Sequence, residues 1–119
     1  MKNILKEASG DSSQVTDELV EAILTPGLRD GAAEVFLDFI SYSGGPLPEE
    51  LLPKCEVPVR MFWGEKDPWE NIDEGRKLYA SYADKFIPLP GVGHCPQDEA
   101  PELVNALLNE FIDDYAATA

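Results

Sequence analysis

The chain has 119 residues, 44% of them hydrophobic, and a formal net charge of −14 from 23 acidic and 9 basic side chains. This length and composition predict one globular domain and exclude a disordered chain. The acidic balance argues against a nucleic-acid partner and against docking on an anionic membrane, since both need a basic surface.

Targeting and redox signals are weak. No run of about 18 apolar residues is present, so we expect no membrane span. The first residues lack the apolar core of a secretory signal, and Glu7 and Asp11 make them too acidic for a transit sequence. Cys55 and Cys95 do not form a disulfide framework, although one bridge between them stays open. We therefore expect a soluble intracellular protein.

The N-terminal part of the chain predicts helices. Residues 4–8 form a short helical segment, followed by a polar break at 10–13. Thr16 is a typical N-cap for a helix that Pro26 and Gly27 should end. Asp30 opens a second helix, which the glycines and prolines of 44–48 interrupt, and residues 49–52 form a short turn.

The C-terminal part alternates strands and helices. Residues 57–63 form a nearly continuous apolar strand, typical of a parallel sheet, and Arg60 indicates a position near an edge or a strand end. A helix is predicted at 72–82, a second strand at 85–89, a loop at 90–100, and a final helix from Pro101 to about Tyr115. This order predicts an α/β fold with a right-handed crossover between parallel strands. Two strands alone make an incomplete sheet.

Two side chains that can work as a catalytic pair follow the predicted strands. Asp67 lies in a loop after the first strand, and His94 lies in the loop after the second. Because parallel strands place such loops at the same edge of a sheet, the carboxylate and the imidazole can meet there. The acid would then orient the histidine and stabilise its charged form, and the histidine would act as general base.

These loops carry a family resemblance. The run strand–Gly-x-x-Asp–helix–strand–Gly-x-Gly-His resembles the last two strands and final helix of the α/β-hydrolase family, with Asp67 at the acid position and His94 at the base position. The amino-acid sequence of residues 15–105 is similar to that of plant and algal plastid-type, pheophytinase-like hydrolases. The resemblance implies that residues 1–53 are the end of a helical cap with its return loop, and that residues 54–119 are the last two strands and final helix of the core. It also makes a plastid an alternative location to the cytoplasm.

The chain departs from the family in one respect. The family's nucleophile sits in a G-x-S-x-G elbow between a strand and a helix. Here the nearest match ends in Ser43-Gly44-Gly45 and has Ser41 where the first glycine belongs. Ser43 follows a helical pattern, and Pro46 prevents the helix that must follow. We therefore do not expect Ser43 to be a nucleophile.

The resemblance thus implies a C-terminal fragment of an ester-type α/β-hydrolase that supplies the acid and histidine of a Ser–Asp–His triad and is inactive alone. An N-terminal hydrolase half would be its partner, and a small-molecule ester its substrate once completed. The alternative is a non-catalytic module that dimerises or completes the sheet of a partner. No cofactor is expected, and no metal, since Cys95, Asp98 and Glu99 beside His94 match no zinc spacing.

Overall fold

The computed structural model describes residues 1–41 and 44–116, and Ser43 lies outside them. The described part holds two strands and a series of helices. The helices are α1 (Lys2–Ala8), α2 (Asp17–Gly27), α3 (Ala32–Ser41), α4 (Pro48–Leu51), α5 (Ile72–Tyr79), α6 (Pro96–Glu99) and α7 (Pro101–Ala116), with short 3-10 turns η1 (Ser12–Gln14), η2 (Leu52–Lys54) and η3 (Ala80–Tyr82). The strands β1 (Arg60–Gly64) and β2 (Lys85–Leu89) pair in parallel.

Local signals explain most of these boundaries. The Thr16 side chain accepts a hydrogen bond from the Leu19 N–H and caps α2, as the sequence predicts. Asn71 caps α5 in the same way, through the N–H groups of Asp73 and Glu74. The strand 85–89 and the final helix from Pro101 are also confirmed.

Several boundaries differ from the sequence expectation. The first strand begins at Arg60 and not at residue 57, because Pro58 has no N–H to donate to a ladder. Helix α3 begins at Ala32, two residues after Asp30, and α5 ends at Tyr79, where the 3-10 turn η3 takes over as far as Tyr82. Helix α6 forms inside the segment predicted as loop, with Pro96 at its first position, where a missing N–H costs nothing.

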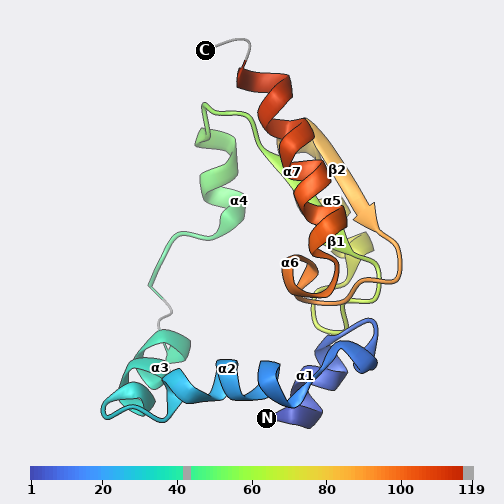
Figure 1. The fold of residues 1–119 in the computed structure, drawn as a ribbon. Coiled ribbons are helices and arrows are strands. Elements are labelled where there is room, and N and C mark those ends of the chain that lie inside the picture. The colour runs from blue at the N-terminus through green and yellow to red at the C-terminus, as the bar shows by residue number, and fades with distance from the viewer. Residues whose placement is uncertain (42–43, 117–119) are drawn as a thin grey trace.

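The two strands carry a helix on each face (Figure 1). Successive strand side chains point to opposite faces, so Arg60 and Trp63 face opposite sides of β1. The Trp63 ring stacks on Tyr79 and lies against Gly75 of α5, where a larger side chain has no room. Arg60 lies over the Phe111 ring of α7 at 5.0 Å. Helices α5 and α7 therefore cover opposite faces of a two-stranded sheet, and the fold class is confirmed as α/β with an incomplete sheet.

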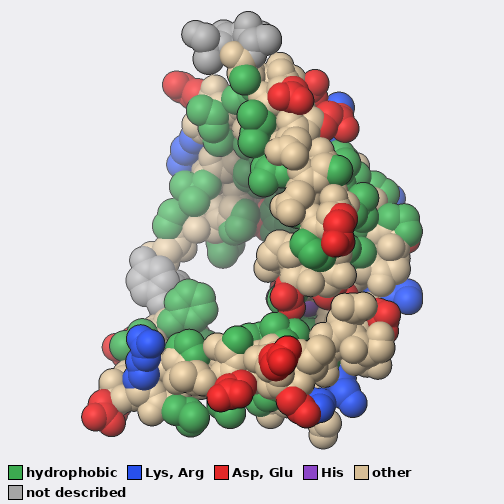
Figure 2. All heavy atoms as spheres, in the orientation of Figure 1, with side chains coloured by type: hydrophobic (Ala, Val, Ile, Leu, Met, Phe, Trp, Pro, Cys, Tyr) green, Lys and Arg blue, Asp and Glu red, His purple; other side chains and the backbone are tan. Residues whose placement is uncertain are grey.

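The molecule is open. Helices α1, α2 and α3 lie beyond the carboxyl ends of the strands (Figure 1), whereas α4 contacts α5 through the hydrogen bond that the Tyr79 hydroxyl donates to Glu49. The radius of gyration is 16.7 Å, against about 13.5 Å for a compact domain of this length. Figure 2 shows a gap between α3 and the strand–helix unit. Among the described helices, none combines the length and the apolar character that crossing a bilayer requires.

Little of the apolar surface is buried. The hydrophobic residues that count as buried are Ala8, Val15, Leu89 and Val92. The accessible surface of 8606 Å² exceeds the roughly 6,400 Å² expected for a folded monomer of this mass. The excess includes the apolar face of α3, with Phe36 and Phe39. The chain thus exposes faces that a closed domain would cover.

Candidate active site

Asp67 and His94 lie in loops that leave the carboxyl ends of β1 and β2. The two loops are joined through their backbones. The Glu65 N–H donates to the Leu89 carbonyl oxygen at 3.1 Å, and the Lys66 N–H donates to the Val92 carbonyl oxygen at 2.9 Å. These bonds hold the acid loop against the histidine loop before any side chain takes part.

Two glycines permit this close approach. A Cβ at Gly64 would meet the carbonyl oxygens of Val92 and Gly93, which are backbone atoms and cannot swing aside. Gly91 has φ of 79°, in the left-handed region that favours glycine. The glycines that mark both loops in the sequence therefore have steric and conformational reasons to be there.

The structure brings the two predicted side chains together. His94 Nδ1 lies 2.9 Å from Asp67 Oδ2. Because a carboxylate only accepts, Nδ1 must carry the proton and donate it, which leaves Nε2 as the ring's free acceptor. The geometry is that of an acid orienting a histidine, whereas their catalytic role stays a prediction.

Asp67 is held from its other side as well. Its Oδ1 accepts from the backbone N–H groups of Trp69 at 2.9 Å and Glu70 at 3.0 Å. Burial alone would raise the pKa of the Asp67 carboxyl, but these N–H groups and the His94 ring outweigh that effect, so its pKa lies below the usual value. The carboxylate is therefore charged at neutral pH and fixed in orientation.

His94 is less enclosed than its partner. The Asp67 side chain is 8% exposed and the His94 side chain is 36% exposed. The Trp69 ring packs edge-on against the imidazole, with centroids 4.7 Å apart. Part of the histidine is visible beside the gap in Figure 2, and Nε2 makes no hydrogen bond to a described residue. The Nε2 atom of the ring is thus open to a further group.

Sequence reasoning missed the supports of the histidine loop. The His94 N–H donates to the Ala8 carbonyl oxygen at 2.8 Å. The Glu99 carboxylate accepts the backbone N–H groups of Gly93 and Cys95, on either side of His94. Spacing along the chain could not reveal either contact, because both depend on how α1 lies against the loop.

The sequence predicts no metal site and leaves a bridge between the two cysteines open. Within 1–41 and 44–116, no three His, Cys, Asp or Glu side chains are grouped so that they could hold a metal ion. Cys55 and Cys95 are both free, so the bridge left open by the sequence is not formed. Burial raises the pKa of the Cys95 thiol, which keeps it protonated and a poor nucleophile.

The chain is similar to two hydrolases over most of its length. It is 31% identical over 114 residues to a protein of Arabidopsis thaliana named pheophytinase, chloroplastic, covering 92% of this chain and 24% of the relative. It is 28% identical over 113 residues to the uncharacterized hydrolase YugF of Bacillus subtilis strain 168, covering 94% of this chain and 41% of the relative. No protein-family model and no solved structure matches the chain.

Fold and similarity agree. Both relatives are α/β-hydrolases, so the chain is related to that family. Its parallel strands and incomplete sheet are consistent with a C-terminal part of the α/β-hydrolase fold. The chain spans only a quarter to two-fifths of the relatives' length.

Proposed function

We propose that this chain supplies the acid, Asp67, and the general base, His94, of a Ser–Asp–His triad in an ester hydrolase. The observation that carries the proposal is the 2.9 Å contact between His94 Nδ1 and Asp67 Oδ2, at the carboxyl edge of a parallel strand pair. The relation to two hydrolases supports the class of reaction.

The chemistry follows from the orientation of the ring. With Nδ1–H donated to Asp67, Nε2 takes the proton of a nucleophilic hydroxyl as that oxygen attacks the ester carbonyl. The Asp67 carboxylate stabilises the imidazolium that forms. Nε2 then returns the proton to the leaving alkoxide, and water, activated by the same nitrogen, releases the acid.

The nucleophile has to come from residues other than these 119. The sequence holds no G-x-S-x-G elbow, and an elbow works only between a strand and a helix. We therefore propose that the chain is inactive alone. Residues 1–53 would be the end of the cap and residues 54–119 the last two strands and final helix of the core, in keeping with the extension of α1–α3 away from the sheet.

The test is to complete the fold. This chain replaces the matched region of the Bacillus subtilis hydrolase, and the chimera is assayed with p-nitrophenyl esters. We expect hydrolysis that His94→Ala lowers on the order of 10³-fold or more, because a triad acts as a unit. Asp73→Asn, a carboxylate change on the exposed start of α5, is the matched control and should leave the rate unchanged. A folded, active chimera that is indifferent to His94→Ala would refute the proposal.

A second candidate is a non-catalytic module that completes the sheet of a partner. The free edge of β1 and the large accessible surface favour it. Pro88 removes one N–H from β2, so β1 is the better edge for a new strand. The charge of −14 opposes pairing of two copies. Light scattering of the purified chain separates the cases: a stable dimer would favour self-association.

The location of the completed protein is proposed only by similarity. The Arabidopsis relative is named as chloroplastic, so we propose a plastid as the first compartment to examine and the cytoplasm as the alternative. Imaging of a fluorescent fusion of the whole gene product distinguishes them.

A further inference from the structure

Glu99, the last residue of α6, gathers three backbone donors on one carboxylate. Its Oε2 accepts from the Gly10 N–H at 2.7 Å and from the Gly93 N–H at 2.9 Å, and its Oε1 accepts from the Cys95 N–H at 3.2 Å. All three contacts are partly buried, and hydrogen bonds to an ionised acceptor are stronger than neutral ones. Glu99 therefore binds two separate stretches of chain to its own helix.

Two of these donors flank the candidate base. Gly93 and Cys95 are the residues immediately before and after His94, so the carboxylate spans the histidine backbone. The His94 N–H itself donates to the Ala8 carbonyl oxygen at 2.8 Å. The three consecutive N–H groups of the loop thus all have fixed acceptors, and the Cα–Cβ bond of His94 has a defined direction.

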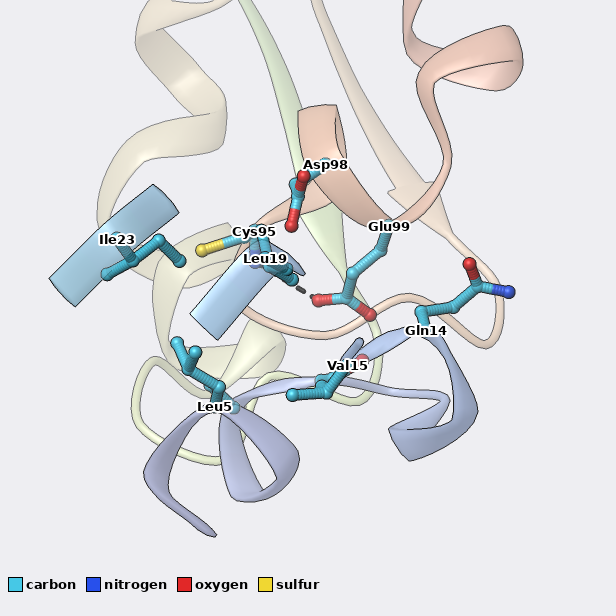
Figure 3. Close-up of a pocket in the computed structure, with 10 residues that line it drawn as sticks. Leu5, Gln14, Val15, Leu19, Ile23, Cys95, Asp98 and Glu99 are labelled. Carbon is cyan, nitrogen blue, oxygen red and sulfur yellow. Dashed lines mark hydrogen bonds between the residues drawn. The ribbon is translucent and has the colours of Figure 1, made fainter. Parts of the chain in front are cut away.

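The third donor belongs to the N-terminal segment. Gly10 and Gly93 pack so closely that a Cβ on Gly93 would meet the Gly10 nitrogen at 2.5 Å and Glu99 Oε1 at 2.8 Å. Beside this contact lies a small pocket, whose apolar wall comes from α1, Val15 and α2 and whose opposite wall comes from Cys95, Asp98 and Glu99 (Figure 3). Ala8 and Val15 of this wall are among the buried hydrophobic residues. Residues 8–10, which connect α1 to the helices that follow, therefore pack against the histidine loop.

We propose that Glu99 is a positioning residue that holds the His94 ring against Asp67 and ties the position of that ring to the seating of residues 8–10. The catalytic meaning of this role rests on the proposed function, whereas the structural coupling does not. A displacement of residues 8–10 removes acceptors and donors from the loop and loosens the imidazole.

His94 is the only histidine of the chain, so one imidazole signal reports on it without ambiguity. We would record ¹H–¹⁵N spectra of the imidazole and amide exchange in the 119-residue chain. The variants are Glu99→Ala, Glu99→Gln and Gly10→Ala, with Asp98→Asn as control. Asp98 is exposed and bonds the loop only through its backbone N–H, which donates to the Cys95 carbonyl oxygen, so the substitution leaves that bond in place.

In the wild type we expect a downfield Nδ1–H signal from the bond to Asp67. In Glu99→Ala and Gly10→Ala this signal should vanish by exchange or move upfield. The amides of Gly93 and Cys95 should exchange roughly tenfold faster or more. In Glu99→Gln the imidazole signal and the exchange rates should lie between those of the wild type and Glu99→Ala. The amide oxygen can still accept from Gly10 and Gly93, while the amide NH₂ group faces the Cys95 N–H. Asp98→Asn should match the wild type, and the β1 and β2 amides should stay protected throughout.

An unchanged imidazole signal in Glu99→Ala would overturn the proposal, as would loss of protection across β1 and β2 together with the loop, since that indicates a merely structural role. If the wild-type chain alone gives no structured signal, the same variants are read in the chimera, where kcat should fall with little change in KM. The two proposals can fail separately. If the imidazole signal changes in Glu99→Ala but the chimera shows no His94-dependent hydrolysis, the proposed function alone is refuted. If the imidazole signal is unchanged but hydrolysis depends on His94, the positioning role alone is refuted.

Discussion

The two carboxylate oxygens of Asp67 have different partners, and the partner of each oxygen determines which nitrogen of His94 carries the proton. Oδ1 takes the turn's N–H groups and Oδ2 faces the ring. The sequence alone predicts that Asp67 and His94 meet, because both follow parallel strands. It does not reveal that Trp69 both donates its N–H to the Asp67 carboxylate and packs against the His94 ring, since that depends on the turn after Asp67.

Asp67→Asn tests this division. The amide can still accept from Trp69 and Glu70 through its oxygen, but it then presents an NH₂ group to the ring. His94 Nδ1 must become the acceptor, and the proton moves to Nε2. We expect the ¹⁵N imidazole shifts to report the opposite tautomer, and the completed protein to lose activity on the order of 10³-fold or more. An unchanged tautomer would contradict the assignment.

Gly64→Ala tests the approach of the two loops. The new methyl group would overlap the backbone of the histidine loop, and Gly27→Ala is its control, because nothing lies within 4 Å there. Gly64→Ala should lower the free energy of unfolding by about 2 kcal/mol. Gly27→Ala should be neutral or slightly stabilising in a helix. Urea denaturation measures both, and equal effects would contradict the packing described.

At the scale of elements, the starts of β1 and β2 are bound to α7 by one charge cluster. The Arg60 side chain is 2% exposed and pairs with Asp84 and Asp114. The bond from Arg60 lowers the pKa of Asp84 from 3.8 to about 2, against a smaller opposing effect of burial. Arg60 is the first residue of β1, at the strand end that its charge within an apolar run predicts.

The pH dependence of stability follows from Asp84. Because its pKa is lower in the folded state, its contribution is complete above pH 4 and is lost as pH falls toward 2. Asp84→Asn should therefore lower stability at neutral pH and flatten the acid side of the profile. Thermal unfolding followed by circular dichroism from pH 7 to pH 2 measures this. Parallel profiles for wild type and variant would contradict the role of Asp84.

Other elements show where local patterns are sufficient. Thr16 and Pro101 mark helix starts correctly because capping and the missing N–H of proline act within one turn. Periodicity cannot decide which side of a helix is covered. In α7 Leu107 is half-buried, whereas the equally apolar Leu108 and Ile112 are exposed. That choice depends on which surfaces are present to pack against.

At the scale of the whole molecule, the excess of accessible surface is roughly 2,200 Å², comparable to that of a large permanent interface. The buried apolar residues Ala8, Val15, Leu89 and Val92 belong to the N-terminal segment and to the end of β2 with the loop after it, while α3 presents its apolar face outward. The sequence predicts an unfinished sheet from its strand count. It cannot predict that α3 also lies uncovered, since its pattern is that of an ordinary packed helix.

This uneven burial predicts an uneven response to mutation in the chain alone. Leu89 is 1% exposed, so Leu89→Ala should lower the free energy of unfolding by about 2–4 kcal/mol. Phe39 is 77% exposed, so Phe39→Ser should change the free energy of unfolding by no more than about 0.5 kcal/mol. The same substitution should decrease the binding of an apolar dye, because it removes exposed apolar surface. Urea denaturation with dye fluorescence measures both. A large loss of stability in Phe39→Ser would show that α3 is covered in solution.

The most direct test of the central claim compares ester hydrolysis by the 119-residue chain with hydrolysis by the same chain completed in the chimera, each with and without His94→Ala. We predict no hydrolysis by the chain alone above its His94→Ala background, and His94-dependent hydrolysis once a nucleophile elbow is supplied. Hydrolysis by the chain alone that disappears in His94→Ala would contradict the account, because the nucleophile would then lie within these residues.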